Sequence, residues 1–141
     1  MSSGDAELGT WPFWALSREA AVTEALDLAA VTGGERFADL GCGDGQVLVA
    51  ASRRGARVAG VEGDPDLATE AEQHLADAGV EADIVVGDLL DPAVVPDADV
   101  YFTYLAPATL QRLVPILRAR RGARLVTVDF PVPTLVPSRR A

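Results

Sequence analysis

The chain is poor in the residues that stabilise small secreted proteins or anchor a protein in a membrane. It has one cysteine, Cys42, so no disulfide can form within the chain, and its 141 residues can bury a core without one. No apolar run approaches the roughly 20 residues of a membrane span. Residues 1–10 are small, polar and acidic rather than a signal sequence. We therefore expect one cytoplasmic domain over residues 1–141 with no membrane partner.

Basic residues are also scarce. The chain has no lysine, and its 12 basic residues face 21 acidic ones, which gives a formal net charge of -9. Binding to the phosphate backbone of a nucleic acid needs clustered lysine and arginine, so this balance argues against a nucleic-acid partner. It favours basic or neutral substrates. The same acidity keeps a protein in solution, and charge alone does not separate the two interpretations.

The most informative stretch is an apolar run that ends in an aspartate and is followed by three alternating glycines. It reads Phe37-Ala38-Asp39-Leu40-Gly41-Cys42-Gly43-Asp44-Gly45. The run over residues 36–40 predicts a buried strand. Glycines at every second position let the following backbone turn sharply and approach a ligand closely. The stretch therefore predicts a loop that binds a nucleotide-like ligand.

The spacing of this loop excludes two common nucleotide sites. A dinucleotide site needs G-x-G-x-x-G, but Gln46 stands three residues after Gly43. A P-loop needs a lysine and a Ser or Thr, and this loop has neither. The loop instead carries two carboxylates, Asp39 and Asp44, which suit a ligand with a cationic head better than a pyrophosphate. These features favour a ligand that carries a sulfonium and an ammonium.

At these residues the chain resembles the class I S-adenosylmethionine-dependent methyltransferases, whose first motif has the form acidic-x-G-x-G-x-G after the first strand. Residues 39–45 match every fixed position of that motif. The resemblance implies that the loop holds the cofactor S-adenosylmethionine, through Asp39, Gly41, Cys42, Gly43, Asp44 and Gly45. For Cys42 we expect a packing role in the loop and not that of a nucleophile. No metal site is predicted.

Two further acids follow the next two expected strands. Glu62, with Gly63 beside it, ends a strand over residues 58–62, and Asp88, with Leu89 beside it, follows a strand over residues 82–86. The resemblance implies that Glu62 holds the two ribose hydroxyls, since a carboxylate can accept a hydrogen bond from each. It also places Asp88 beside the adenine amino group. Acids after three successive strands are a more specific signal than a glycine loop alone.

The order of the elements predicts the fold. Apolar runs alternate with helical segments, as a parallel sheet with crossover helices requires. We expect helices over residues 17–30, 46–54, 65–78 and 108–118, and strands over 36–40, 58–62, 82–86, 99–105 and 124–129. The expected N-caps are Ser17 and Asp64, and Pro115 is expected to kink or split the last helix. The fold class is α/β, a Rossmann-like three-layer sandwich with a mostly parallel sheet that lacks the last strands of the seven-strand class I fold.

The acceptor side of the site is less specific. Methyltransferases that act on adenine or glutamine amides carry an Asp/Asn-Pro-Pro-aromatic motif after the fourth strand, and this chain has Tyr104-Leu105-Ala106-Pro107 there. Both substrates are therefore disfavoured. Tyr104 is the candidate catalytic residue, because a phenol at the strand end can orient an amine or oxygen. A packed strand aromatic is an equal alternative for Tyr104 and the preferred one for Tyr101.

Two aromatic residues and the single histidine have less definite roles. Phe13 and Trp14 lie in the N-terminal arm or lid over residues 1–16, where they either close over the cofactor or dock the terminus. His74 is surrounded by acids on an expected helix, so we expect it to be solvated and not catalytic.

A closer resemblance includes the flanks of the core motif. Pro12-Phe13-Trp14, the glycine loop, Tyr104-Leu105-Ala106-Pro107 and Asp129-Phe130-Pro131-Val132-Pro133 together are similar to small bacterial relatives of the ATP synthase c-subunit lysine N-methyltransferases. This resemblance implies an amine acceptor such as a protein lysine, or a small molecule. A cofactor-binding partner protein without activity is the alternative. An aminopropyltransferase shares the fold, but the fourth strand lacks an acid for a polyamine.

The relatives continue past the fifth strand into a closing β-hairpin, where this sequence has only the tail, residues 134–141. An incomplete sheet leaves the fifth strand as an edge, which invites pairing with a second copy or covering by the proline-rich tail. A homodimer is therefore possible. The other interpretation is that the sequence ends early for reasons unrelated to function.

Overall fold

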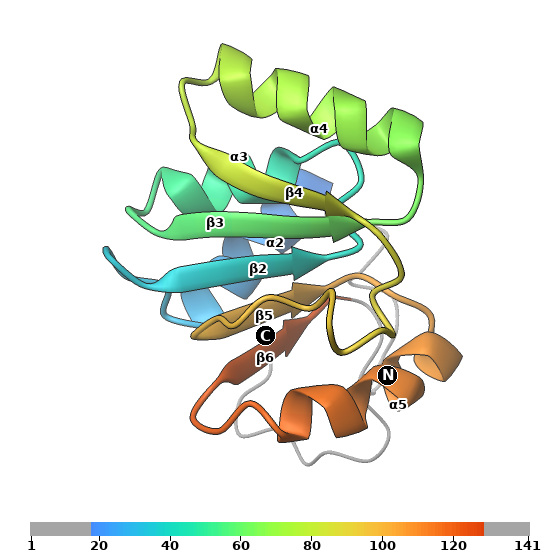
Figure 1. The fold of residues 1–141 in the computed structure, drawn as a ribbon. Coiled ribbons are helices and arrows are strands. Elements are labelled where there is room, and N and C mark those ends of the chain that lie inside the picture. Colours follow the sequence, from blue (N-terminus) through green and yellow to red (C-terminus); the bar gives the residue numbers. More distant parts are fainter. Residues whose placement is uncertain (1–17, 129–141) are drawn as a thin grey trace.

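Five parallel strands form one sheet in residues 18–128, the part of the chain that this computed structural model describes (Figure 1). The spatial order of the strands is β4-β3-β2-β5-β6, and each neighbouring pair is parallel. Their bounds are β2 Arg36–Leu40, β3 Arg57–Glu62, β4 Ala82–Val86, β5 Val100–Thr103 and β6 Arg124–Thr127. At the carboxyl end, Leu40 of β2 is aligned with Val61 of β3 and Thr103 of β5. The loops that follow the strands therefore leave the sheet along one edge.

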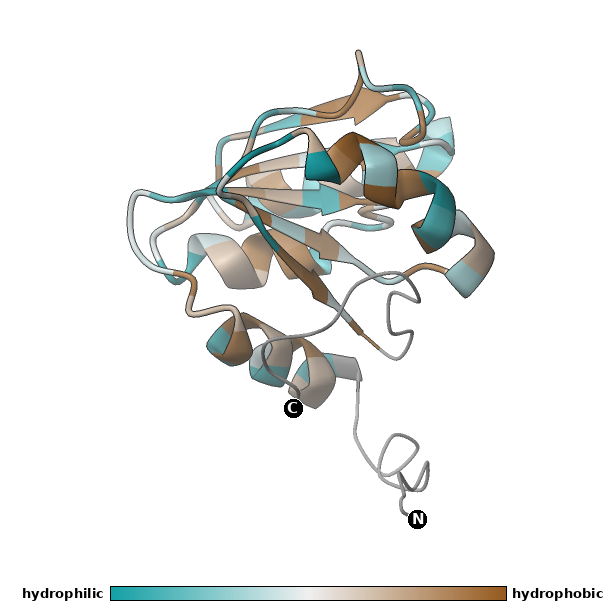
Figure 2. Cartoon of the chain, turned by 90° about the horizontal axis from the view of Figure 1, so that it is seen from below, coloured by the Kyte–Doolittle hydropathy of each residue, from teal (hydrophilic) through white to brown (hydrophobic). Residues whose placement is uncertain are grey.

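Helices cover both faces of the sheet and give the fold three layers. Three of them, α2 (Arg18–Leu28), α3 (Gln46–Ser52) and α4 (Pro65–Asp77), share a buried cluster on one face. On the other face α5 (Pro107–Arg118) buries Leu113 and Leu117. Figure 2 shows helices of mixed hydropathy around a sheet in which hydrophobic residues predominate. The predicted α/β, Rossmann-like three-layer fold is confirmed.

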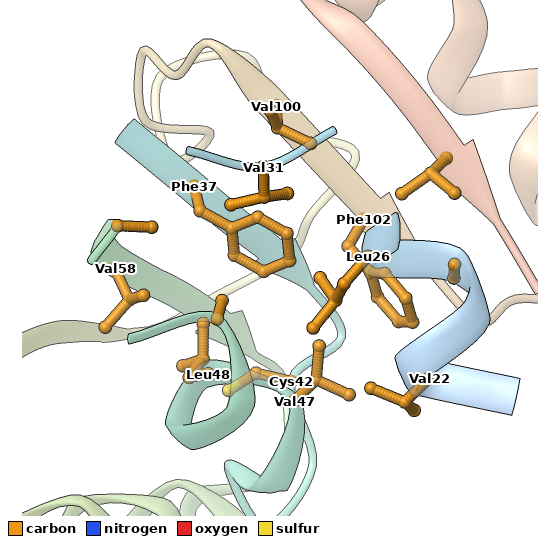
Figure 3. Close-up of a cluster of buried hydrophobic side chains, with 14 of the residues drawn as sticks. Val22, Leu26, Val31, Phe37, Cys42, Val47, Leu48, Val58, Val100 and Phe102 are labelled. Carbon is orange, nitrogen blue, oxygen red and sulfur yellow. The ribbon is translucent and has the colours of Figure 1, made fainter. Parts of the chain in front are cut away.

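The core explains why the central strands read as continuous apolar runs. Residues that alternate along β2 face opposite layers, with Phe37 in the α2–α3 cluster and Ala38 in the α5 cluster. A strand buried on both faces has apolar residues at most positions, as parallel sheets generally do, and Asp39 is the buried polar exception in β2. Figure 3 shows Phe37 and Phe102 of neighbouring strands among side chains of α2 and α3, and their ring centroids lie 6.1 Å apart.

The predicted Asp64 N-cap begins α4, and a left-handed glycine follows its end. The Asp64 side chain accepts a hydrogen bond from the backbone N–H of Asp66 at 2.9 Å, and Pro65 takes the first helical position. Such a cap satisfies one of the donors that a helix leaves free at its N-terminus. Gly79 follows the helix with φ +72°, a conformation that side chains disfavour.

Pro115 was predicted to kink or split the last helix, and the split does not occur. Residues 107–118 form one helix with Pro115 inside it. A proline removes the hydrogen bond to the carbonyl four residues earlier, which here belongs to Gln111. Both residues are exposed, so water can donate a hydrogen bond to the Gln111 carbonyl in place of the missing N–H. The helix therefore continues through Pro115, stabilised by the packing of its buried residues such as Leu113 and Leu117.

Some predicted boundaries shift by one or two residues, and some fall outside the described residues. β5 is shorter than predicted and ends at Thr103, which leaves Tyr104 in the loop before α5. The structure describes residues 18–128, which leaves out Ser17, Asp129 and the tail over residues 134–141. Pairing with a second copy therefore stays one of two predictions for this edge. Within that range no helix is long and apolar enough to cross a membrane.

Candidate cofactor site

The glycine loop turns directly after β2 and is bound to the neighbouring strand. The backbone N–H groups of Gly41 and Cys42 both donate to the carbonyl of Val61, at 2.8 and 3.0 Å. Gly41, Gly43 and Gly45 have φ values of +87°, +54° and +86°, in the left-handed region that favours glycine. The alternating glycines of the sequence thus take the alternate left-handed positions of the turn.

The last two of these glycines meet different surroundings. A Cβ added at Gly45 would lie 3.1 Å from the Cα of Ala71, so this glycine allows the loop to pack closely against α4. A Cβ added at Gly43 would meet no atom within 4 Å. Gly43 therefore borders open space, which a ligand can approach.

Glu62 stands beside this open space and joins the loop to the end of β3. Its Oε1 accepts a hydrogen bond from Gly43 N at 2.8 Å, and its Oε2 accepts one from Asp64 N at 2.9 Å. A carboxylate has about four acceptor positions. Glu62 consequently keeps the capacity to accept further hydrogen bonds from a ligand.

Asp88 lies at the next strand end. Gly87 N donates to the carbonyl of Glu62 at 3.1 Å, which fixes the end of β4 next to that of β3. The Oδ1 of exposed Asp88 accepts a hydrogen bond from Leu90 N at 2.9 Å. Gly63 is exposed between the two strand ends, and a Cβ on it would lie 3.7 Å from the Gly87 carbonyl oxygen. The structure therefore brings the predicted acids to adjacent strand ends.

Two leucines border the loop on the side of α5. A Cβ added at Gly41 would lie 3.3 Å from Leu105 Cδ2 and 3.7 Å from Leu89 Cδ2. Leu89 is thus close to the glycine loop, and its contact with the cofactor stays a prediction. Leu105, which follows β5, was predicted only as part of a strand, and the signal that it could border the loop was its place after the adjacent strand.

Asp39 and Cys42 are buried under the loop. Each is only 2% exposed. The Cys42 Sγ points into the core, where a Cβ added at Gly60 would lie 2.8 Å from it (Figure 3). Burial raises the pKa of the Cys42 thiol to about 12, and the neighbouring carboxylate of Asp39 adds to the shift. The thiol is therefore protonated at neutral pH and packs in the core, and only the backbone of Cys42 faces the loop.

Asp44 and His74 connect the loop with its flanking helices. The Asp44 carboxylate accepts hydrogen bonds from the Gln46 backbone N–H at 3.3 Å and from its Nε2 at 3.1 Å. His74 is exposed, as expected, but its Nδ1 also lies 2.7 Å from the Asp44 carbonyl oxygen. His74 follows Ala71 by three residues on α4, so the two share a helix face. That spacing was the signal that could have placed His74 against the loop.

The two tyrosines in and after β5 differ in burial. Tyr101 is fully buried, and its Oη donates to the carbonyl of Pro96 at 2.6 Å, in agreement with a packing role. Tyr104 is 41% exposed directly after β5. Its role at the methyl site stays a prediction. Phe13 and Trp14 lie outside the described residues.

Comparison with known proteins identifies the family. Residues 39–139 match the family model of the ANTKMT methyltransferase domain. The chain belongs to this family. A crystal structure of an RNA methyltransferase from Salinibacter ruber with S-adenosyl-L-homocysteine is similar to the chain, with a TM-score of 0.78 and 33% identity over 88% of this chain and 84% of that one. The predicted class I S-adenosylmethionine-dependent methyltransferase domain is confirmed.

Other relatives are much longer than this chain. The adenine nucleotide translocase lysine N-methyltransferase of Mus musculus is 37% identical over 107 residues, which are 72% of this chain and 46% of that protein. The 23S rRNA (uracil(1939)-C(5))-methyltransferase RlmD of a Shewanella strain is 42% identical over 62 residues, which are 44% of this chain and 14% of that protein. The chain therefore spans less than half the length of these two curated relatives.

Proposed function

We propose that the chain binds S-adenosylmethionine across the carboxyl ends of β2, β3 and β4 and transfers its methyl group to an amine. The observation that carries this proposal is the hydrogen bond of 2.8 Å between Glu62 Oε1 and Gly43 N, beside open space over Gly43. It places a carboxylate with spare acceptor capacity at the point where the loop leaves room for a ligand.

The proposed roles of the acids follow from their positions. Glu62 would accept hydrogen bonds from the two ribose hydroxyls, and Asp88, exposed after β4, would lie beside the adenine amino group. The loop that runs from Asp39 through Asp44 would hold the methionine part, whose ammonium suits the negative field of these carboxylates.

Bound S-adenosylmethionine would supply an activated methyl group, so the chain itself needs mainly to hold the acceptor in line. Positioning of this kind lowers a barrier by up to about 7 to 11 kcal/mol. Tyr104 is the proposed residue that orients the acceptor through its phenol. A carboxylate beside an acceptor amine would raise the pKa of that amine and keep it protonated. We therefore assign no acidic residue as the sole base.

The proposed acceptor is a protein lysine. Support comes from the mouse relative, which is named as a lysine N-methyltransferase, and from the net charge of -9, which attracts a cationic side chain. A small amine would satisfy the same chemistry. The alternative of a cofactor-binding partner without activity is not favoured, because the matched family and relatives are named as methyltransferases.

RNA is the second candidate acceptor. The solved relative from Salinibacter ruber is named as an RNA methyltransferase and is similar over most of both chains. The charge of this chain weighs against RNA, since binding to phosphates needs clustered bases. We rank it below a protein amine for that reason.

A methyl-transfer assay separates these acceptors. Purified protein would be incubated with S-adenosylmethionine carrying a labelled methyl group, together with separate bacterial protein and RNA fractions. The chain has no lysine, so any methyl-lysine recovered comes from the added protein. We expect labelled methyl-lysine, less of it with Tyr104→Phe, and none with Glu62→Ala. Label found only in RNA would replace the first proposal by the second, and no label in any fraction would contradict both.

A further inference from the structure

The connection between β4 and β5 is unusual because it contains no helix. Parallel strands are generally joined by a helical crossover. Here residues 87–99, which we call the 87–99 crossover, run from β4 to β5 through turns and irregular segments. This segment begins with the proposed adenine side of the cofactor site, Asp88 and Leu89. Something other than a helix must therefore fix its shape.

Arg120, just past the end of α5, supplies much of this support. Its guanidinium lies within hydrogen-bond distance of five oxygen atoms, four of them in the crossover. Nη1 lies 3.0 Å from Val95 O, 3.1 Å from Pro96 O, 2.9 Å from Asp97 Oδ1 and 3.4 Å from Tyr101 Oη, and Nη2 lies 3.1 Å from Pro92 O. Nη1 has two hydrogens, so its four acceptors share them. One side chain thus gathers the carbonyls of three crossover residues.

Tyr101 holds the same segment from inside the sheet. Its Oη donates to Pro96 O at 2.6 Å and accepts from Ala98 N at 3.1 Å. Tyr101 is fully buried and the Arg120 side chain is only 19% exposed, so water competes little for these bonds. The ion pair with Asp97 contributes less, because the Asp97 side chain is 77% exposed.

Two backbone hydrogen bonds connect the supported part of the crossover to the adenine side. Asp91 N donates to Asp88 O and Val94 N donates to Asp91 O, both at 2.9 Å. Leu89, Leu90 and Val94 pack against the buried cluster that α5 shares with the sheet. A change in the position of Val94 to Pro96 would therefore be passed back to Asp88.

We propose that Arg120 is a positioning residue of the methyltransferase site, which fixes the 87–99 crossover so that Asp88 and Leu89 can select adenine. The inference rests on the proposed function, because it needs the cofactor to bind at the strand ends. Arg120 touches no part of that site itself and acts through the crossover. Its loss should therefore reduce the preference for adenine and leave the glycine loop intact.

The test measures binding of two ligands that differ only in the base. Dissociation constants for S-adenosylhomocysteine and S-inosylhomocysteine would be obtained by calorimetry for the full chain and for Asp88→Ala, Arg120→Ala, Arg120→Lys and the double variant. Arg124→Ala is the matched control. Arg124 lies at the start of β6 and pairs with Glu35, at the opposite end of the sheet from the carboxyl ends of the strands. Thermal melts confirm that each variant is folded at the temperature of the titration.

Arg120→Ala is expected to weaken S-adenosylhomocysteine binding about tenfold, the scale of one lost charge-assisted hydrogen bond, and to bring the two ligands close to equal affinity. Arg120→Lys should recover part of the preference, Arg124→Ala should keep all of it, and the double variant should lose no more than Asp88→Ala. If Arg120→Ala does not fold, Tyr101→Phe, which removes the bonds to Pro96 O and Ala98 N, should lose part of the preference for adenine.

Several results would overturn the inference. A folded Arg120→Ala with the wild-type base preference would do so, as would effects of Asp88→Ala and Arg120→Ala that simply add. If the wild type binds S-adenosylhomocysteine without preferring it to the inosine form, only this inference fails. If the wild type binds neither ligand, the proposed function fails as well.

Discussion

Glu62 is the residue on which the proposed cofactor site depends most. Its carboxylate bonds Gly43 N and Asp64 N, so it shapes the loop as well as facing the open space. In Glu62→Gln one of the two oxygens is replaced by an NH2 group, which cannot accept a hydrogen bond, so one of these two bonds is lost. We expect at least a tenfold loss of S-adenosylhomocysteine affinity and about 1 to 3 kcal/mol of lost stability. Calorimetry and urea unfolding measure the two effects. Glu70→Gln, on the exposed surface of α4, is the control, and equal affinities would refute the role of Glu62.

Thr103 has a buried hydroxyl without a hydrogen-bond partner. It is fully buried at the end of β5, and its Oγ1 is the one such side-chain atom among the described residues. An unmet buried hydroxyl costs free energy, so the isosteric Thr103→Val should raise the free energy of unfolding by about 1 kcal/mol. Urea denaturation checks this. A decrease would mean that the hydroxyl does have a partner.

At the scale of elements, two glycines of the loop differ in role: Gly45 packs against α4, and Gly43 borders the proposed ligand space. Gly45→Ala would place a Cβ 3.1 Å from the Ala71 backbone in α4, whereas Gly43→Ala meets no atom within 4 Å. Both substitutions carry the strain of a left-handed residue, roughly 1 to 2 kcal/mol. We expect Gly45→Ala to lower the melting temperature clearly more than Gly43→Ala does. Gly43→Ala should instead lose ligand affinity, because its methyl group enters the open space.

The outcome to look for is a reversal of rank between the two variants in melting and in titration with S-adenosylhomocysteine. If Gly43→Ala bound the ligand as tightly as the wild type, the open space over Gly43 would not be the binding site.

The elements most visible in the sequence are those whose residues satisfy local rules. The run before Gly41 predicts β2 because both faces of a central strand are apolar, and Asp64-Pro65 predicts the start of α4 because cap and proline act locally. The contacts of His74 and Arg120 were not predicted, since each bonds a carbonyl of a distant segment. Backbone carbonyls have no sequence signature. The continuity of α5 through Pro115 likewise depends on exposure, which only the packing of that helix determines.

In the candidate site, likewise, the positions of the residues could be predicted and their side-chain contacts could not. Its acids follow strand ends, so their proximity could be predicted from the topology of a parallel sheet. That Glu62 bonds the loop backbone, or that the Cys42 thiol points into the core, depends on side-chain directions that spacing does not give.

At the scale of the whole molecule, an ion pair ties the amino-terminal edge of the sheet together. Arg124 at the start of β6 bonds both oxygens of Glu35 at 2.9 Å, and its Nε bonds Ala29 O at 3.0 Å. The hydrogen bonds from Arg124 lower the pKa of Glu35 from 4.5 to about 2. A lowered pKa means that the stabilisation is present above pH 4.5 and is lost as the pH falls toward 2.

We therefore expect the free energy of unfolding to fall between pH 4.5 and about 2, and Glu35→Gln to reduce that slope. Asp99, whose pKa the Arg36 backbone N–H also lowers, would account for part of the slope that remains. Urea unfolding at a series of pH values measures both. Because the Arg124 side chain is 42% exposed, salt should weaken the effect. An unchanged slope in Glu35→Gln would contradict this account of the edge.

The central claim is that the ends of β2, β3 and β4 form one binding site for S-adenosylmethionine. The most direct test is an amide NMR titration of the full chain with S-adenosylhomocysteine. The account predicts that signals of Gly43, Glu62, Gly63, Asp88 and Leu89 shift together and saturate at one ligand per chain. Signals at the start of β6, around Arg124, should stay in place. No saturable shift, or shifts that leave Gly43 and Glu62 unchanged, would contradict it.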